Sequence, residues 1–292
     1  MNDEVSERAL NRSTLVREFT VSAKSFLERL QAHEELLKLH HYDMETMRAV
    51  RERGADPSLF RYRGEDDCRF LSALTSLPGI GPLDLRMADL RGANLREAKL
   101  REAILLEADL SGAELHEANL SLAKLSSANL SRANLCKADL RGANLHEANL
   151  GGTNLSWADL NMVDLSGAKM RAALLCEANL SRSNLVAADL GGAHLNTADL
   201  YAANLCQADL SGARLRGADL RWTILRDTVL SGVDLRDADL CKAKDLTECQ
   251  IRSARINENT KLDPKFDNLK REILAAQASK DAQDRLLFDL NI

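Results

Sequence analysis

The sequence has few aromatic residues and no paired cysteines, and each shortage excludes a class of protein. Phe, Tyr and Trp make up only 4% of the 292 residues, although 45% of the chain is hydrophobic. A globular core filled by large aromatic side chains is therefore not indicated. The six cysteines show neither a CxxC pair nor a disulfide-framework spacing, which disfavours a zinc ribbon or a disulfide-stapled domain. Unpaired cysteines are typical of a reducing compartment, so we expect a cytoplasmic location.

Long apolar runs and an excess of one charge are also missing. No segment approaches the ~18 apolar residues that cross a bilayer, and the acidic N-terminus is unlike a signal peptide. The net charge of −5 is too small to attract the chain strongly to nucleic acid or to an anionic membrane. The composition predicts no membrane span and no direct nucleic-acid binding, and it leaves open delivery as a secreted effector.

What the sequence has in abundance is leucine at a fixed interval. From Leu85 to Leu240, every residue whose number divides by five is leucine except Met170, and most residues two places earlier are alanine. This interval matches neither the 3.6-residue period of a helix nor the two-residue period of a strand. It fits a chain that turns a corner every five residues, so that four corners close a coil of 20 residues. Leucine and alanine would then point inward, and stacked coils would lie about 4.8 Å apart.

Two further regularities agree with stacked coils. No proline lies between residues 83 and 263, as expected where every backbone N–H is needed for a β-ladder. Glycine two places after the leucine recurs at multiples of 20 residues, namely at Gly92, Gly112, Gly152, Gly192, Gly212 and Gly232. This recurrence predicts that one corner of the coil has a tighter or more permissive turn than the other three.

The repeat, seen in ADLRGANLHEANL at residues 138–150, resembles the A(D/N)LXX motif of the pentapeptide-repeat family. The resemblance covers about residues 83–256. It implies an all-β solenoid, a right-handed quadrilateral β-helix of about eight to nine coils with helical segments at its ends. One column of the inner lining would consist of Leu100, Leu120, Leu140, Leu160, Leu180, Leu200, Leu220 and Leu240.

The flanks of the repeat carry helical signals. Apolar residues at alternating three- and four-residue steps predict helix over 13–53, which either packs on the first coil or forms a coiled-coil dimerisation arm. Asp263 and Pro264 are typical of a helix start. The resemblance also implies, as an open alternative, a homodimer through the terminal helices. We expect a helical region over 1–60, a linker or first-coil cap over 61–82, the β-helix over 83–262 and a helical cap over 263–292.

The outward-facing columns contain little that could do chemistry. His116 and Cys136 lie one coil apart, but a metal site or a nucleophile needs further ligands or a base, and a flat wall excludes no water. Asp and Asn fill most positions before the leucines. There they either bond to the turn backbone or, on a second interpretation, imitate DNA phosphates. We expect no catalytic residue, no metal site and no cofactor.

The remaining signal is a set of apolar side chains on the outside. Leu122, Met162 and Trp222 share one column, and Trp157 and Tyr201 lie near it. An exposed tryptophan on a rigid wall is suited to anchor another protein. The leading hypothesis is a non-enzymatic scaffold that presents rigid β-helix faces to a protein partner.

The alternative is a DNA mimic that binds and protects a type II topoisomerase, as the gyrase-protecting, quinolone-resistance members of the family do. Residues 81–256 carry 23 acidic and 21 basic residues, whereas a DNA mimic should be strongly negative. Those relatives often place phenylalanine at the central position of the repeat, and this chain has none there. Both departures disfavour the alternative.

Overall fold

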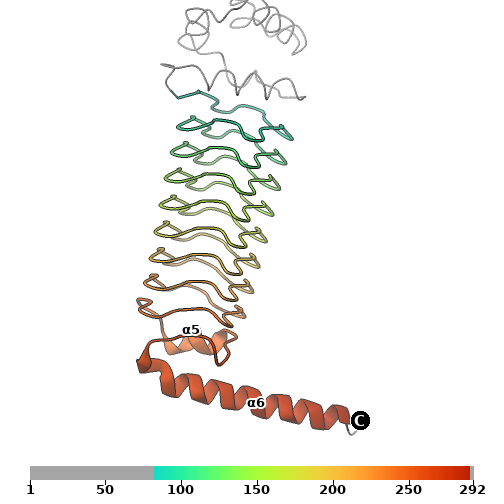
Figure 1. The fold of residues 1–292 in the computed structure, drawn as a ribbon, viewed down its shortest axis with the longest axis vertical. Helices are drawn as coiled ribbons and strands as arrows, with labels where there is room; N and C mark the ends of the chain where they lie inside the picture. The colour runs from blue at the N-terminus through green and yellow to red at the C-terminus, as the bar shows by residue number, and fades with distance from the viewer. Residues whose placement is uncertain (1–81, 290–292) are drawn as a thin grey trace, which may run out of the picture.

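The computed structural model describes residues 82–289, and its main feature is a stack of coils (Figure 1). Parallel β-bridges pair a residue with the one 20 positions later, from Asp84 with Ile104 to Ile224 with Lys244. Each bridge is a single residue pair on one side of the coil, and the residues between bridges form turns. The described chain is a four-sided solenoid whose sides are bridges rather than extended strands.

Backbone hydrogen bonds hold each side of a coil to the next coil. At the Asn119–Asp139 bridge, the amide of Leu120 donates to the carbonyl of Asp139 at 2.7 Å, and the amide of Asp139 donates to the carbonyl of Ala118 at 2.9 Å. The same pattern recurs along the regular coils. Because the amide of each bridge residue and the amide of the residue that follows it are both used, a proline at these positions would remove a ladder bond.

Leucine and alanine line the inside of the solenoid. From Leu85 to Leu240 no leucine of the repeat is more than 3% exposed, and Met170 is fully buried in the same position. Burial of each leucine contributes roughly 1.5–3 kcal/mol, so the stack is held mainly by its lining. The buried residues include the column Leu100, Leu120, Leu140, Leu160, Leu180, Leu200, Leu220 and Leu240.

A few hydroxyl side chains replace the inward-facing alanine. Thr153 donates to the carbonyl of Leu130, and Thr228 donates to the carbonyl of Leu205, each at 2.7 Å. These bonds remove the cost of burying a polar group without a partner. Thr223 instead donates to the carbonyl of Leu220 in its own turn, at 2.7 Å, whereas the buried hydroxyl of Ser183 has no hydrogen-bond partner among the described residues.

Each corner is a turn in which the residue two places after the leucine has a left-handed backbone. Its φ lies between +54° and +71° on all four corners, in glycine and in other residues alike. The turn is closed by a bond such as that from the amide of Ala143 to the carbonyl of Leu140, at 2.9 Å, as in a type II turn. The prediction that glycine marks one tighter corner is wrong, because all four corners share this conformation.

The last coil differs from the others because a short helix replaces one of its sides. Helix α5 (Glu248–Ser253) begins with a capping box, in which Thr247 and Gln250 each accept a hydrogen bond from the other's backbone amide. The Gln250 amide group also donates to the carbonyls of Leu225 and Thr228, at 2.8 and 2.9 Å. It thereby satisfies two carbonyls of the preceding coil.

A longer helix covers the C-terminal end of the stack. The short helix η2 (Pro264–Phe266) leads into α6 (Asp267–Asp289). Leu269 of α6 is buried in the core, and an ion pair of 3.0 Å between Arg252 and Glu272 joins α6 to α5. Figure 1 shows α6 starting under one edge of the last coil and projecting past the opposite edge.

Asp263 does not cap the C-terminal helix with its side chain. Its carboxylate instead accepts a hydrogen bond from the amide of Lys242 at 2.7 Å. The residue therefore completes the last corner of the solenoid, and the helix begins beyond it as the three-residue turn η2. The expected helix start is confirmed, because Asp263 occupies the N-cap position and Pro264 follows it in the first turn, but the Asp263 side chain makes no capping hydrogen bond.

The predicted helical region over 1–60 and the predicted linker or cap over 61–82 lie outside the described residues, except for Pro82. Among residues 82–289 there is no helix long and apolar enough to cross a bilayer.

Candidate interaction surface

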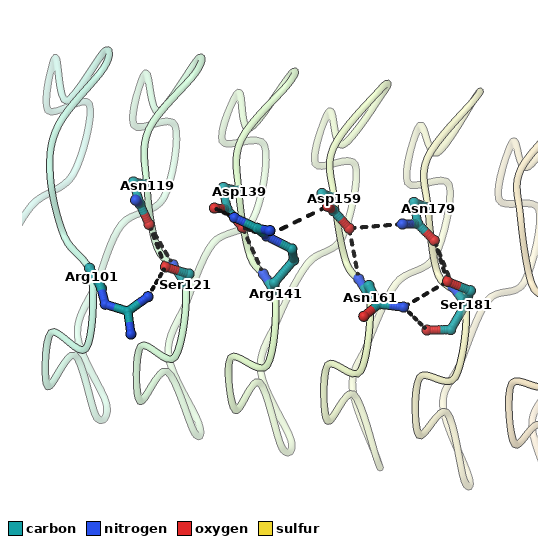
Figure 2. Close-up of polar contacts among 9 residues, drawn as sticks. All are labelled: Arg101, Asn119, Ser121, Asp139, Arg141, Asp159, Asn161, Asn179 and Ser181. Carbon is teal, nitrogen blue, oxygen red and sulfur yellow. Dashed lines mark hydrogen bonds and ion pairs between the residues drawn. The ribbon is translucent and has the colours of Figure 1, made fainter.

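One side of the solenoid carries a polar ladder, which Figure 2 shows over four coils as Asn119, Asp139, Asp159 and Asn179. Each of these side chains accepts a hydrogen bond from the backbone two residues later. The amides of Arg141 and Asn161, for example, donate to Asp139 and Asp159 at 3.1 Å. Coils are also linked directly, since the Asn179 amide group donates to Asp159 at 3.0 Å. The ladder therefore fixes the turns and joins the coils.

Arginines beside this ladder neutralise its carboxylates. Arg141 lies 2.7 Å from Asp139 and 3.6 Å from Asp159, and Arg221 lies 2.6 Å from Asp219. Hydrogen bonds from these arginines hold the pKa values of Asp139 and Asp219 below their ordinary range. The ladder is therefore a network of paired charges, which favours the structural interpretation of its Asp and Asn residues.

The histidines of the described residues do not build a catalytic or metal site. His116 lies 3.4 Å from the carboxylate of the next residue, and the nearby Cys136 amide donates to Asn134. His146 lies 2.9 Å from the hydroxyl of Ser166, but that hydroxyl donates its proton to Asp164 and is not available to a base. No cluster of three His, Cys, Asp or Glu side chains in residues 82–289 could hold a metal ion.

Large apolar side chains stand exposed on two neighbouring corners. On one corner Met162 is 62% exposed, Leu122 45% and Trp222 40%, and on the preceding corner Trp157 is 53% exposed. Tyr201 is half-buried. Three of the five candidate residues thus share a corner, and Trp157 stands across one side of the coil from Met162. Tyr201 is the first of the two turn residues at the shared corner in its own coil.

The backbone of these corner residues adds a cost that burial does not offset. Leu122, Met162 and Trp222 have φ values of +59°, +58° and +62°, a region that costs an L-residue other than glycine about 1–2 kcal/mol. Exposed side chains recover little of this by removing apolar surface from water. Charged corner residues such as Glu117 and Lys137 share this backbone conformation, so the distinguishing feature of the three apolar residues is the large apolar surface that they leave exposed.

Two cations lie over aromatic rings on this surface, a feature that sequence reasoning missed. The Lys242 ammonium lies 4.8 Å from the centre of the Trp222 ring, and the Arg221 guanidinium lies 5.7 Å from that of Tyr201. Such pairs are attractive and orient the rings. The sequence contained the signal, since each cation follows its ring by 20 residues. Exposed apolar residues outside the predicted set are Met87, Leu174 and Val229.

Repeats of this kind define a known class. The family model for pentapeptide repeats matches this sequence in eight copies, over residues 88–126, 123–161, 158–196 and 193–232. The chain belongs to the pentapeptide-repeat family.

Two solved structures illustrate the likeness. HetL, a pentapeptide repeat protein involved in heterocyst differentiation regulation from the cyanobacterium Nostoc sp. strain PCC 7120, is 30% identical over 69% of this chain and 100% of its own, with a TM-score of 0.51. A trypsin-treated form of QnrB1, a plasmid-mediated fluoroquinolone resistance protein, is 21% identical over 66% of this chain and 96% of its own, with a TM-score of 0.58. The second likeness concerns the fold alone. None of the curated proteins matches the chain.

Proposed function

We propose that this protein is a non-enzymatic scaffold whose rigid β-helix presents corner side chains to a protein partner. The observation that carries this proposal is the exposure of bulky apolar side chains, two of them tryptophan, on the corners of the solenoid, because aromatic side chains are typical anchors of protein interfaces. A wall fixed by backbone bonds loses little conformational freedom on binding, which favours affinity. The proposed partner-binding surface consists of Leu122, Trp157, Met162, Tyr201 and Trp222.

The similar protein HetL gives this proposal a precedent in kind. HetL is involved in heterocyst differentiation regulation, and a regulatory role exerted by binding would suit a rigid solenoid with exposed apolar side chains. We do not assign heterocyst regulation to this chain, because the proposed surface is argued from exposed apolar residues of its own sequence and not from HetL.

The alternative, a DNA mimic that protects a topoisomerase, has weaker support. It rests on the family and on QnrB1, which is a fluoroquinolone resistance protein. Against it, Arg141 and Arg221 neutralise the carboxylates that would have to imitate phosphates. Purified protein should therefore leave gyrase supercoiling and quinolone poisoning unchanged, and protection of gyrase in that assay would favour the alternative.

The test of the scaffold is affinity capture by the full chain from its native cell, followed by identification of the bound proteins. We expect Trp157→Ala and Trp222→Ala to reduce recovery of the partner at least tenfold, as truncation of an aromatic anchor costs about 2 kcal/mol or more. The matched control is Glu147→Ala, which changes an exposed, left-handed residue on another corner. Equal recovery by all four proteins would remove the proposed surface.

Three expectations stay predictions. They are the cytoplasmic location, the homodimer through terminal helices and the division of the chain at residues 60, 82 and 262. The projection of α6 beyond the last coil supports the second, because it leaves part of that helix away from the stack (Figure 1).

A further inference from the structure

One corner of the solenoid, called here the 102–242 corner, has an unusual sequence of side chains. It is formed by the left-handed turn residues that follow one another at intervals of 20, and all except Ala202 are exposed. Read from the first coil to the last, an acidic residue begins the series and a basic residue ends it, and between them lie three large apolar residues, two small residues and one arginine. The members are Glu102, Leu122, Gly142, Met162, Arg182, Ala202, Trp222 and Lys242.

We propose that a second copy of this chain packs along the 102–242 corner in the antiparallel direction, related by a twofold axis. The inference rests on the proposed function, because it takes Leu122, Met162 and Trp222 as binding residues and names their partner. In a twofold contact, residue i of one copy meets residue j of the other, and j meets i. Full overlap of the two corners pairs Glu102 with Lys242, Leu122 with Trp222, Gly142 with Ala202, and Met162 with Arg182.

Each of these four pairings is chemically favourable. Glu102 meets the opposite charge of Lys242, and the apolar side chain of Leu122 meets the ring of Trp222. Gly142 and Ala202 are small and add little bulk between these contacts, and the Leu122 side chain lies over Gly142. Met162 meets Arg182, whose aliphatic stem can cover an apolar neighbour while the guanidinium stays in water. By symmetry every pairing occurs twice.

The register of this contact is specified by the same residues. A shift by one coil in one direction places Arg182 against Arg182 of the second copy, which is repulsive. A shift in the other direction places Glu102 against Trp222 and leaves Lys242 without its carboxylate. Only the fully overlapped register gives both ion pairs without a clash of like charges, which is how charged pairs select one arrangement over others.

The columns beside the corner are compatible with this arrangement. In the same register Arg141 lies opposite Tyr201 on one flank, and Lys124 lies opposite Ile224 on the other, so like charges do not meet. Two of the other three corners lack this property, and the remaining one is mostly glycine and has no large apolar side chain to contribute. On the preceding corner the same operation would place Glu97 against Asp237, and the following corner carries three acidic residues, Glu107, Glu147 and Asp227.

The corner is also long and accessible. Seven coil steps of about 4.8 Å make it ~34 Å long, which suits a standard interface of about 800 Å² per partner if the flanking columns take part. Asp263 bonds to the amide of Lys242, so the chain enters α6 beside this corner. Because α6 then projects past the opposite edge (Figure 1), it leaves the corner uncovered.

Charge exchange at the two ends of the corner tests the proposal directly. Sedimentation equilibrium of the full chain should show a dimer at low salt, and Glu102→Lys or Lys242→Glu alone should weaken it by about tenfold, since each creates two repulsive pairs. The double variant should restore the dimer, because the opposite charges face each other again. Glu117→Lys, an exposed left-handed residue on the preceding corner, is the control and should change nothing.

Glu102 already forms an exposed ion pair with Arg101 of its own chain, at 3.0 Å. Such a pair contributes little and can be shared with a second cation. A monomeric wild-type chain, or a dimer that neither single exchange weakens, would overturn the proposal. So would two single exchanges that weaken the dimer without rescue by the double variant.

Small-angle scattering separates this dimer from one built through the terminal helices. The side-by-side pair should keep nearly the maximum dimension of one copy, whereas an end-to-end pair should almost double it, and the second result would overturn the proposal. Failure here is distinct from failure of the scaffold, because Trp157 lies on another corner. Capture that still depends on Trp157 would leave the scaffold standing without the dimer.

Discussion

The inside of the solenoid and its corners are built from the same five-residue repeat, but they differ in how strictly the amino-acid type is restricted. Inside, leucine and alanine recur with few exceptions, and each exception is either apolar or hydroxyl-bearing. On the corners, a single backbone conformation holds glycine, glutamate, lysine, methionine and tryptophan alike. The interior is restricted by volume and by the absence of water, whereas nothing within the coil restricts the corner side chains. Residues that serve the fold and residues free to serve binding are therefore separated by their place in the repeat.

The largest expected effect comes from a charge placed inside. Leu160 is fully buried, so Leu160→Asp removes about 1.5–3 kcal/mol of burial and leaves a carboxylate without a partner in a dry interior. We expect a loss of more than about 4 kcal/mol and unfolding of the middle coils, measured by urea denaturation followed by circular dichroism. Leu160→Met is the control, since Met170 occupies the equivalent position, and it should cost under about 1.5 kcal/mol. If Leu160→Asp were as stable to urea as the wild-type protein, the inward-facing position of Leu160 would be contradicted.

The interior was predictable from the sequence because its rule has few exceptions. The five-residue interval places each leucine of the repeat, and all of them are buried between Leu85 and Leu240. Helix α5 was not predicted, although Thr247 and Gln250 have the spacing of a capping box. The apolar residues Leu246, Ile251 and Ile256 continue a five-residue interval through the helix, and all three are buried. A regular coil side would bury the same positions. Periodicity alone could not distinguish a coil side from a short helix that buries the same positions.

The corners were less predictable, for a related reason. The recurrence of glycine on one corner suggested a special backbone there, but Glu97, Lys137 and Trp157 adopt the same φ on another corner. Amino-acid preference at a turn reflects a cost of only about 1–2 kcal/mol, which a long stack of buried leucines can offset. Composition at a corner therefore says little about its conformation.

An intermediate loss of stability is expected when the charge of Asp237 is removed, because its carboxylate joins two coils near the end of the stack. The carboxylate of Asp237 accepts hydrogen bonds from Asn257, Asn259 and Arg216 at 2.8, 2.9 and 2.7 Å. These bonds lower the pKa of Asp237 to about 2, below the value of about 3.9 in an unfolded chain. The group therefore stabilises the fold above about pH 4, and this contribution is lost as the pH falls toward 2.

We expect Asp237→Asn to lower the Tm at pH 7, with a difference from wild type that shrinks between pH 4 and pH 2. Thermal denaturation of both proteins across this range measures the difference. Asp227→Asn is the matched control, because Asp227 is an exposed corner residue ten positions earlier in the chain. A difference between Asp237→Asn and wild type that stays constant from pH 7 to pH 2 would show that the carboxylate charge is not responsible.

The smallest expected effect comes from removal of the largest side chain on a corner. Trp157 has a φ of +59° and is 53% exposed. Trp157→Gly removes the backbone strain of a left-handed residue, which stabilises the fold by about 1–2 kcal/mol. Glycine also raises the entropy of the unfolded chain, which costs about 0.5–1 kcal/mol. The free energy of unfolding should therefore stay within about 1 kcal/mol of the wild-type value or rise. In the same coil, Leu155→Gly removes a buried side chain and should cost at least the 2–5 kcal/mol typical of Leu→Ala. Equal losses in urea denaturation would mean that Trp157 serves the fold, and the strongest reason to regard the corners as a binding surface would be gone.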